Sequence, residues 1–134
     1  MNRLKRVVIF WGVMLPSLAF AQSADTATPN NAQKPAMIKS TQPLVTLHLP
    51  ANPTTGYSWY LVKYPHAYFQ VLKHLYLAPS TKNVGAGGYD VWQFKAKPGA
   101  FVVPRVFKIR MMYARAWEVG DNTPVKTFYV VTQS

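Results

Sequence analysis

Side chains that could perform chemistry are few in this chain and far apart in its sequence. The 134 residues contain no cysteine, three histidines and four carboxylates. The carboxylates form no evident pair for acid–base catalysis: Asp25, Asp90, Glu118 and Asp121. The histidines lack the spacing of metal ligands and fall on separate predicted elements: His48, His66 and His74. With no cysteine and no serine in a nucleophile-elbow motif, we expect a protein that is not an enzyme and that needs no metal and no cofactor.

The stretch under the most conformational constraint is NPTTGYSW, residues 52–59. Pro53 fixes its own φ and favours extended geometry at the residue before it, while Gly56 can adopt a positive φ. Thr54 and Thr55 form the tip, and both are too small and polar for a core position. We therefore predict a stiff, exposed loop that is suited to binding. The ordinary alternative for a loop with Pro and Gly is a simple connection between strands.

Apolar and polar residues alternate on both sides of this loop, which is the pattern of half-buried strands. We expect strands at residues 37–39, 44–49, 57–62, 69–77, 92–96, 101–113 and 125–132. No segment shows an apolar stripe with a period of 3.6 residues. The pattern predicts an all-β fold, an immunoglobulin-like antiparallel β-sandwich of about seven strands, which gathers alternate loops at one end.

The alternation also predicts which side chains face the core. Trp59 and Trp92 are expected between the sheets, because each alternates with polar neighbours. His48 and His74 are expected on the outward sides of their strands. Pro104 cannot donate to a ladder, so it limits the first half of residues 101–113 to an edge or a bulge.

The N-terminal end has the pattern of an export signal. Three cations precede an apolar run at residues 7–18, and Ala19-Phe20-Ala21 is a small-x-small cleavage site. A membrane anchor is the alternative, but the run is shorter than the ~20 residues needed to span a bilayer. We expect a signal peptide at 1–21, a flexible leader at 22–36 and the β-sandwich domain at 37–134. The protein would then be exported, to the periplasm rather than the extracellular space, with no stable membrane insertion after signal removal.

The mature chain is strongly basic. Loss of residues 1–21 leaves 12 Lys and Arg against 4 Asp and Glu, a net charge of +8. Such a balance favours anionic partners without choosing among them. The cations are spread along the sequence, as on solvated strand faces. A nucleic-acid partner is not expected. We expect a monomer.

Two further loops contain unusual residues. Glycines flank a single alanine at Gly85, Ala86, Gly87 and Gly88. No Lys-Ser/Thr pair or helix pattern follows, so a phosphate cradle is excluded and a close backbone approach is the better explanation. The second loop, residues 114–124, begins with Arg115 and Trp117. Trp117 is expected at an interface, and Arg115 could act there, remain solvated or pair with Glu118.

These motifs together resemble those of the chagasin family, proteinaceous inhibitors of papain-like cysteine proteases. NPTTGYSW looks like the signature loop of the family, and GAGG (85–88) and YARAW (113–117) resemble its two other binding-loop motifs in the same order. The resemblance covers about Leu44 to Val131. Ala116 departs from the pattern, because the family usually has proline there, and the change loosens the third loop.

The resemblance implies a reversible, noncovalent competitive inhibitor that fills the active-site cleft of a papain-like cysteine protease with three loops. Thr54 to Gly56 would approach the catalytic cysteine and histidine of the target, with the other two loops on the opposite walls. Tyr57 could instead serve the core. The implied protease-binding residues are Asn52, Pro53, Thr54, Thr55, Gly56, Tyr57, Gly85, Ala86, Gly87, Gly88, Arg115 and Trp117. The alternative is an exported immunoglobulin-like module that binds an acidic polymer or cell-surface component.

Overall fold

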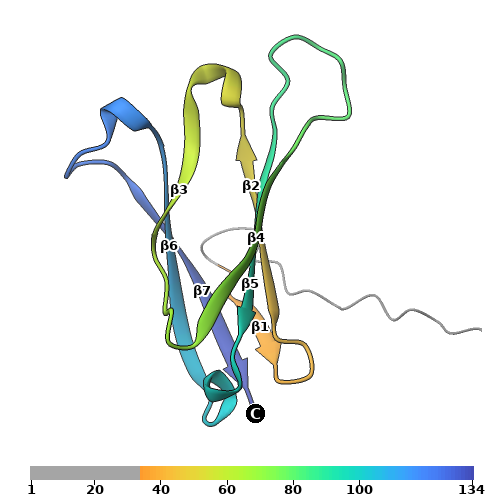
Figure 1. Cartoon of the computed structure of the whole chain (residues 1–134), viewed down its shortest axis with the longest axis vertical. Helices are drawn as coiled ribbons and strands as arrows, with labels where there is room; N and C mark the ends of the chain where they lie inside the picture. Colours follow the sequence, from red (N-terminus) through yellow and green to blue (C-terminus); the bar gives the residue numbers. More distant parts are fainter. Residues whose placement is uncertain (1–33) are drawn as a thin grey trace, which may run out of the picture.

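A computed structural model describes residues 34–134, and these form seven strands in two sheets (Figure 1). One sheet has the order β1-β7-β6-β3 and the other β2-β5-β4. The strands are β1 (Ala36–Lys39), β2 (Leu44–Ala51), β3 (Tyr57–Lys63), β4 (Phe69–Leu77), β5 (Gly88–Ala96), β6 (Arg105–Arg115) and β7 (Val125–Gln133). Three short 3-10 turns lie between strands: η1 (Pro53–Thr55), η2 (Pro98–Phe101) and η3 (Ala116–Glu118). The predicted immunoglobulin-like β-sandwich of about seven strands is confirmed. The predicted signal peptide and most of the leader lie outside the described residues.

The core lies between the two sheets and consists of alternate residues from both. Its largest fully buried apolar side chains are Phe69, Phe94, Phe128, Ile38, Leu47, Ile109, Met111, Val45 and Val130. Trp59 is buried as predicted, while Trp92 is half-buried and packs against the margin of the core. No cysteine is present in the chain, so apolar packing has to stabilise the fold without disulfides.

Strand β4 differs from the predicted pattern at one point. The ladder with β5 pairs Val71 with Phe94 but Lys73 with Gln93, so one extra residue is inserted between them. Such a bulge exchanges the faces of all residues that follow it. His74 therefore lies opposite Trp92, on the side of the sheet that faces the core, and the prediction that it points outward is wrong. The bulge also turns Leu77 away from the core, and its side chain is 46% exposed.

One strand boundary and one strand pairing also differ from the expectation. The strand expected from residue 101 begins at Arg105, because residues 98–101 form η2 and Pro104 cannot donate to a ladder. β1 pairs with β7 in parallel, whereas the other strand pairs are antiparallel. Residues 34–134 contain no helix with the length and apolar character to cross a bilayer.

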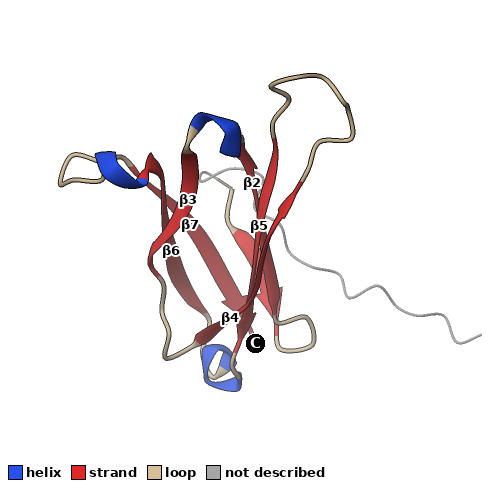
Figure 2. Cartoon of the chain, turned by 45° about the horizontal axis from the view of Figure 1, so that its top comes forward, coloured by secondary structure: helices blue, strands red, loops and turns tan. Residues whose placement is uncertain are grey.

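Three connections meet at one end of the sandwich (Figure 1). The β2–β3 loop is in the middle, with the β4–β5 loop on one side and the β6–β7 loop on the other, and the turned view in Figure 2 shows the same order. The last residue, Ser134, lies at the other end of the molecule. The topology therefore gathers the three motifs on one surface, as the sandwich prediction required.

Candidate functional site

The central loop is a tight turn whose own polar groups hold it. Pro53 starts η1, and Gly56 ends it with a φ of 79°, in the left-handed region that favours glycine. The hydroxyl of Thr54 donates to Oδ1 of Asn52 at 2.6 Å, and that of Thr55 donates to the Asn52 carbonyl at 2.7 Å. Pro53, Thr54 and Thr55 are exposed. The tip is therefore both accessible and pre-ordered.

The β6–β7 loop is attached to the central loop through Arg115 and Trp117. Nε of Arg115 donates to the carbonyl of Thr55 at 3.1 Å, and Nη1 donates to Oε1 of Glu118 at 3.1 Å. The guanidinium also lies over the Tyr57 ring, 4.7 Å from its centroid. The indole of Trp117 is 74% exposed and passes so close to Gly56 that a Cβ atom there would lie 3.0 Å from it. The Arg115–Glu118 pair, one of the open alternatives, is thus present together with a contact to the central loop.

The β4–β5 loop is attached on the opposite side through Asn52. Nδ2 of Asn52 donates to the carbonyl of Gly85 at 3.0 Å. A Cβ atom at Gly87 would lie 3.2 Å from the Ala51 carbonyl oxygen, and one at Gly88 would lie 2.7 Å from the Tyr76 hydroxyl. The glycines therefore permit a close backbone approach, as the sequence suggested.

A group of packed aromatic rings lies at the base of the central loop. The Tyr57 and Tyr113 rings stack with centroids 5.2 Å apart, and Tyr113 lies 4.9 Å from the Trp59 ring. The backbone N–H of Asn52 donates to the Tyr113 hydroxyl at 3.2 Å, and Nε1 of Trp59 donates to the Pro50 carbonyl at 2.9 Å. The base of the central loop is thus joined to the core.

Two hollows lie beside the base of the central loop. Each has a volume of about 370 Å³; Asn52 and Gly87 border one, and Tyr57 and Glu118 border the other. Tyr113 lines both. The exposed tip of the central loop therefore lies between the other two loops, with a hollow on each side of its base.

The structure brings all twelve predicted site residues to this end of the molecule, on the three loops and the adjoining ends of β3, β5 and β6. The sequence interpretation missed Tyr113, whose hydroxyl bonds to the loop although its position on the strand suggested only a core role. It also missed Val84, which is fully exposed in the β4–β5 loop. A bulky apolar residue within a polar, glycine-rich segment was the available signal for Val84.

The described residues do not form a metal centre. Residues 34–134 hold no group of three histidine, aspartate or glutamate side chains placed to bind a metal ion. His74 stacks on Trp92 with centroids 4.0 Å apart, and its Nε2 lies 3.5 Å from Oδ1 of Asp90. His74 lies in β4, before the β4–β5 loop, and Asp90 lies in β5, after it; the His74 side chain is 45% exposed.

Comparisons with known proteins agree with this geometry. Chagasin from Trypanosoma cruzi is 30% identical over 78 residues, which cover 55% of this chain and 66% of chagasin, just under two thirds of its length. The crystal structure of a cysteine protease inhibitor from Entamoeba histolytica superposes with a TM-score of 0.55 at 21% identity, covering 81% of this chain and 97% of that one. The solution structure of amebosin gives a TM-score of 0.53 at 22% identity, with 81% and 94% covered. These two likenesses show the shared fold.

A family model covers most of the described domain. The model for the chagasin family of peptidase inhibitors matches residues 40–132, which include all three loops and every strand except β1 and the last residue of β7. This is a family of inhibitors and not of enzymes. The chain belongs to the chagasin family of peptidase inhibitors.

Proposed function

We propose that this protein is a reversible, noncovalent competitive inhibitor of papain-like cysteine proteases that occludes the active-site cleft with its three loops. Membership of a peptidase-inhibitor family supports the inhibitory role, and a structural relative is named as a cysteine protease inhibitor. Such an inhibitor performs no chemistry of its own. It acts by preventing the substrate from reaching the catalytic residues of the enzyme.

The observation that carries the proposal is the pre-ordered tip at Thr54 and Thr55. Both hydroxyls already donate to Asn52, and Arg115 holds the Thr55 carbonyl. The loop therefore loses little conformational freedom when it enters a cleft, so more of the contact energy remains as affinity. In the complex, Thr54, Thr55 and Gly56 would approach the catalytic cysteine and histidine of the protease.

The flanking loops would contact the two walls of the cleft. Trp117 and Arg115 are residue types that often dominate interface energies, and Trp117 is largely exposed in the free protein. Gly85 to Gly88 would lie along the opposite wall, with Val84 projecting beyond them. Tyr57 is half-buried beneath Arg115, so its role would be to support the interface rather than to fill the cleft.

An inhibition assay of the purified protein against a panel of papain-like proteases tests the proposal. Activity should fall to zero near one equivalent of inhibitor, and the inhibition should be competitive and reversible. Trp117→Ala and Thr55→Gly should each weaken binding by about 2 kcal/mol if these residues are hot spots. Tyr129→Ala removes a partly exposed aromatic ring from β7, outside the loops, and should leave inhibition unchanged. No loss of protease activity at micromolar inhibitor would overturn the proposal.

Export and a monomeric state remain part of the proposed function. Cell fractionation with a C-terminal epitope tag should find a processed protein that starts near Gln22 in the periplasm. Light scattering of the free protein should give the mass of one chain. A cytoplasmic, unprocessed protein would contradict the proposed export.

A further inference from the structure

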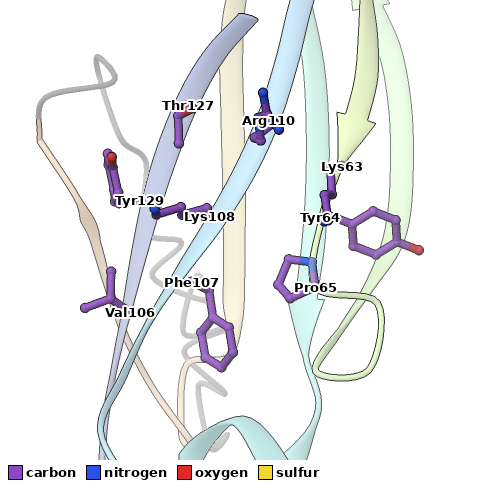
Figure 3. A pocket seen from close by; sticks show the side chains of 9 residues that line it. All are labelled: Lys63, Tyr64, Pro65, Val106, Phe107, Lys108, Arg110, Thr127 and Tyr129. Carbon is purple, nitrogen blue, oxygen red and sulfur yellow. The ribbon is translucent and has the colours of Figure 1, made fainter.

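A third hollow lies on the β1-β7-β6-β3 sheet, outside the three loops. Its volume is about 590 Å³, and Figure 3 shows the side chains around it. The lining residues are Lys63, Tyr64, Pro65, Val106, Phe107, Lys108, Arg110, Thr127 and Tyr129. The hollow forms where β3 ends at Lys63 while β6 continues to Arg105, so the sheet is one strand narrower there. We call it the basic groove.

Strand register gathers three cations at this groove although they are spread in the sequence. Lys63 lies directly opposite Arg110 in the β3–β6 ladder, and Lys108 is two residues from Arg110 on the same face of β6. Neighbours of these kinds are separated by about 5 Å across strands and about 7 Å along a strand. The three charged groups can therefore act on one bound molecule.

No carboxylate compensates these charges within residues 34–134. Among the described carboxylates, Asp90 lies next to His74 and Glu118 pairs with Arg115, and neither contact involves the groove. The remaining described carboxylate, Asp121, lies in the β6–β7 loop. The only charge contact inside the groove is Lys108 over the Tyr129 ring, 5.8 Å from its centroid. The groove is thus a concentrated positive site that attracts anions.

The groove also offers apolar surface beside the charges. Val106 is 63% exposed and Tyr129 is 37% exposed, and Pro65 lies on the opposite side, next to Lys63. A bare inorganic ion uses only the cations and is much smaller than the hollow. A flat lipid surface does not enter a recess. A short sugar chain with anionic substituents matches the whole site, because its ring faces pack on aromatic and aliphatic groups while its anions meet the cations.

We propose that the basic groove binds an oligosaccharide that carries sulfate or phosphate ester groups. The site uses none of the residues of the three loops, so saccharide and protease would bind at the same time. The inference goes beyond protease inhibition and does not depend on it. Its consequence is that the inhibitor is retained on an anionic glycan while its loops stay free.

Calorimetric titration with a heparin-derived hexasaccharide tests the proposal on the purified protein. The triple variant Lys63→Gln, Lys108→Gln, Arg110→Gln should bind at least tenfold more weakly. The matched variant Lys73→Gln, Lys82→Gln, Lys95→Gln also removes three positive charges, but from β4, β5 and the loop between them. It should change the affinity less than twofold. The salt dependence of binding should become shallower only in the groove variant, because fewer counterions are released. Equal losses in both triple variants would overturn the proposal, since they would show attraction to net charge alone.

Two further measurements distinguish an anionic saccharide from other anionic ligands. Tyr129→Ala should weaken hexasaccharide binding several-fold and leave the weak binding of inorganic sulfate unchanged. Equal affinity for inorganic sulfate and hexasaccharide, or tighter binding to anionic phospholipid vesicles or a phosphopeptide than to hexasaccharide, would overturn the saccharide assignment. Thermal unfolding checks that each variant is folded. Protease inhibition by the groove variant is a separate readout, so failure of one proposal does not affect the other.

Discussion

The indole of Trp117 packs against Gly56, so closely that a single methyl group on the glycine would lie 3.0 Å from Cη2 of the indole. This contact joins the most exposed aromatic side chain of the β6–β7 loop to the end of the central turn. The orientation of Trp117 thus depends on the lack of a side chain at one position. The consequence can be tested directly.

Gly56→Ala should weaken protease inhibition tenfold or more. The substitution places a side chain at a φ of 79°, which costs about 1–2 kcal/mol, and it also displaces the indole. Gly85→Ala provides the comparison, because Gly85 has a φ of 81° but open space around it. The inhibition constants of both variants are the measurement. An equal loss in both would show that backbone strain alone is responsible and that the Trp117 contact is unimportant.

Arg115→Lys should weaken inhibition about tenfold although the charge is kept. Lysine cannot reproduce the fork that reaches both the Thr55 carbonyl and Glu118 while the group lies flat over Tyr57. Arg110→Lys on the same strand is the control, and it should leave the inhibition constant unchanged. Full inhibition by Arg115→Lys would mean that position 115 contributes only charge.

Asn52→Asp should loosen the β4–β5 loop. The donor to the Gly85 carbonyl is replaced by a carboxylate oxygen, which repels that carbonyl, while the acceptor for Thr54 is kept. Amide hydrogen exchange at residues 85–87 should become faster, and inhibition should weaken. Asn83→Asp introduces the same charge in the same loop without that bond and serves as the control. Unchanged exchange at residues 85–87 would contradict the role of Asn52 as the link between the loops.

Ala116→Pro should stabilise the protein by about 0.4–1 kcal/mol, by reducing the freedom of the unfolded chain. Arg115 has φ −82° and ψ 138°, the geometry that proline favours in the residue before it, and Ala116 is the first residue of η3, where proline is tolerated. Urea unfolding measures the stability, and the inhibition constant should fall or stay the same. A loss of stability would show that the backbone N–H of Ala116 is needed.

Met111→Ala should lower the free energy of unfolding by about 2–5 kcal/mol, because Met111 is fully buried between the sheets. Met112→Ala, one residue further on the outer face, should cost less than about 1 kcal/mol. Chemical denaturation of both variants gives the comparison. Similar losses would mean that side chains on the two faces of β6 contribute equally to the free energy of unfolding.

Alternation and turn residues were enough to predict the strands, the burial of Trp59 and the meeting of the three loops at one end. They did not predict the bulge in β4. Val71, Leu75 and Leu77 are separated by even numbers of residues, which predicts one shared face, but the extra residue after Val71 puts Leu75 and Leu77 on the opposite face. The bond between Asn52 and Tyr113 joins positions 61 residues apart, and no local pattern indicates it. The basic groove was missed for the same reason, because it depends on the pairing of Lys63 with Arg110.

The position of Ser134, at the far end from the central tip, has a practical consequence. A carrier protein or a solid support joined through the carboxyl terminus would stand well away from the surface that meets the enzyme. The domain is therefore suited to immobilisation as an affinity resin or to display on a larger scaffold. The C-terminal end of β7, which pairs with β1, would serve as the point of attachment.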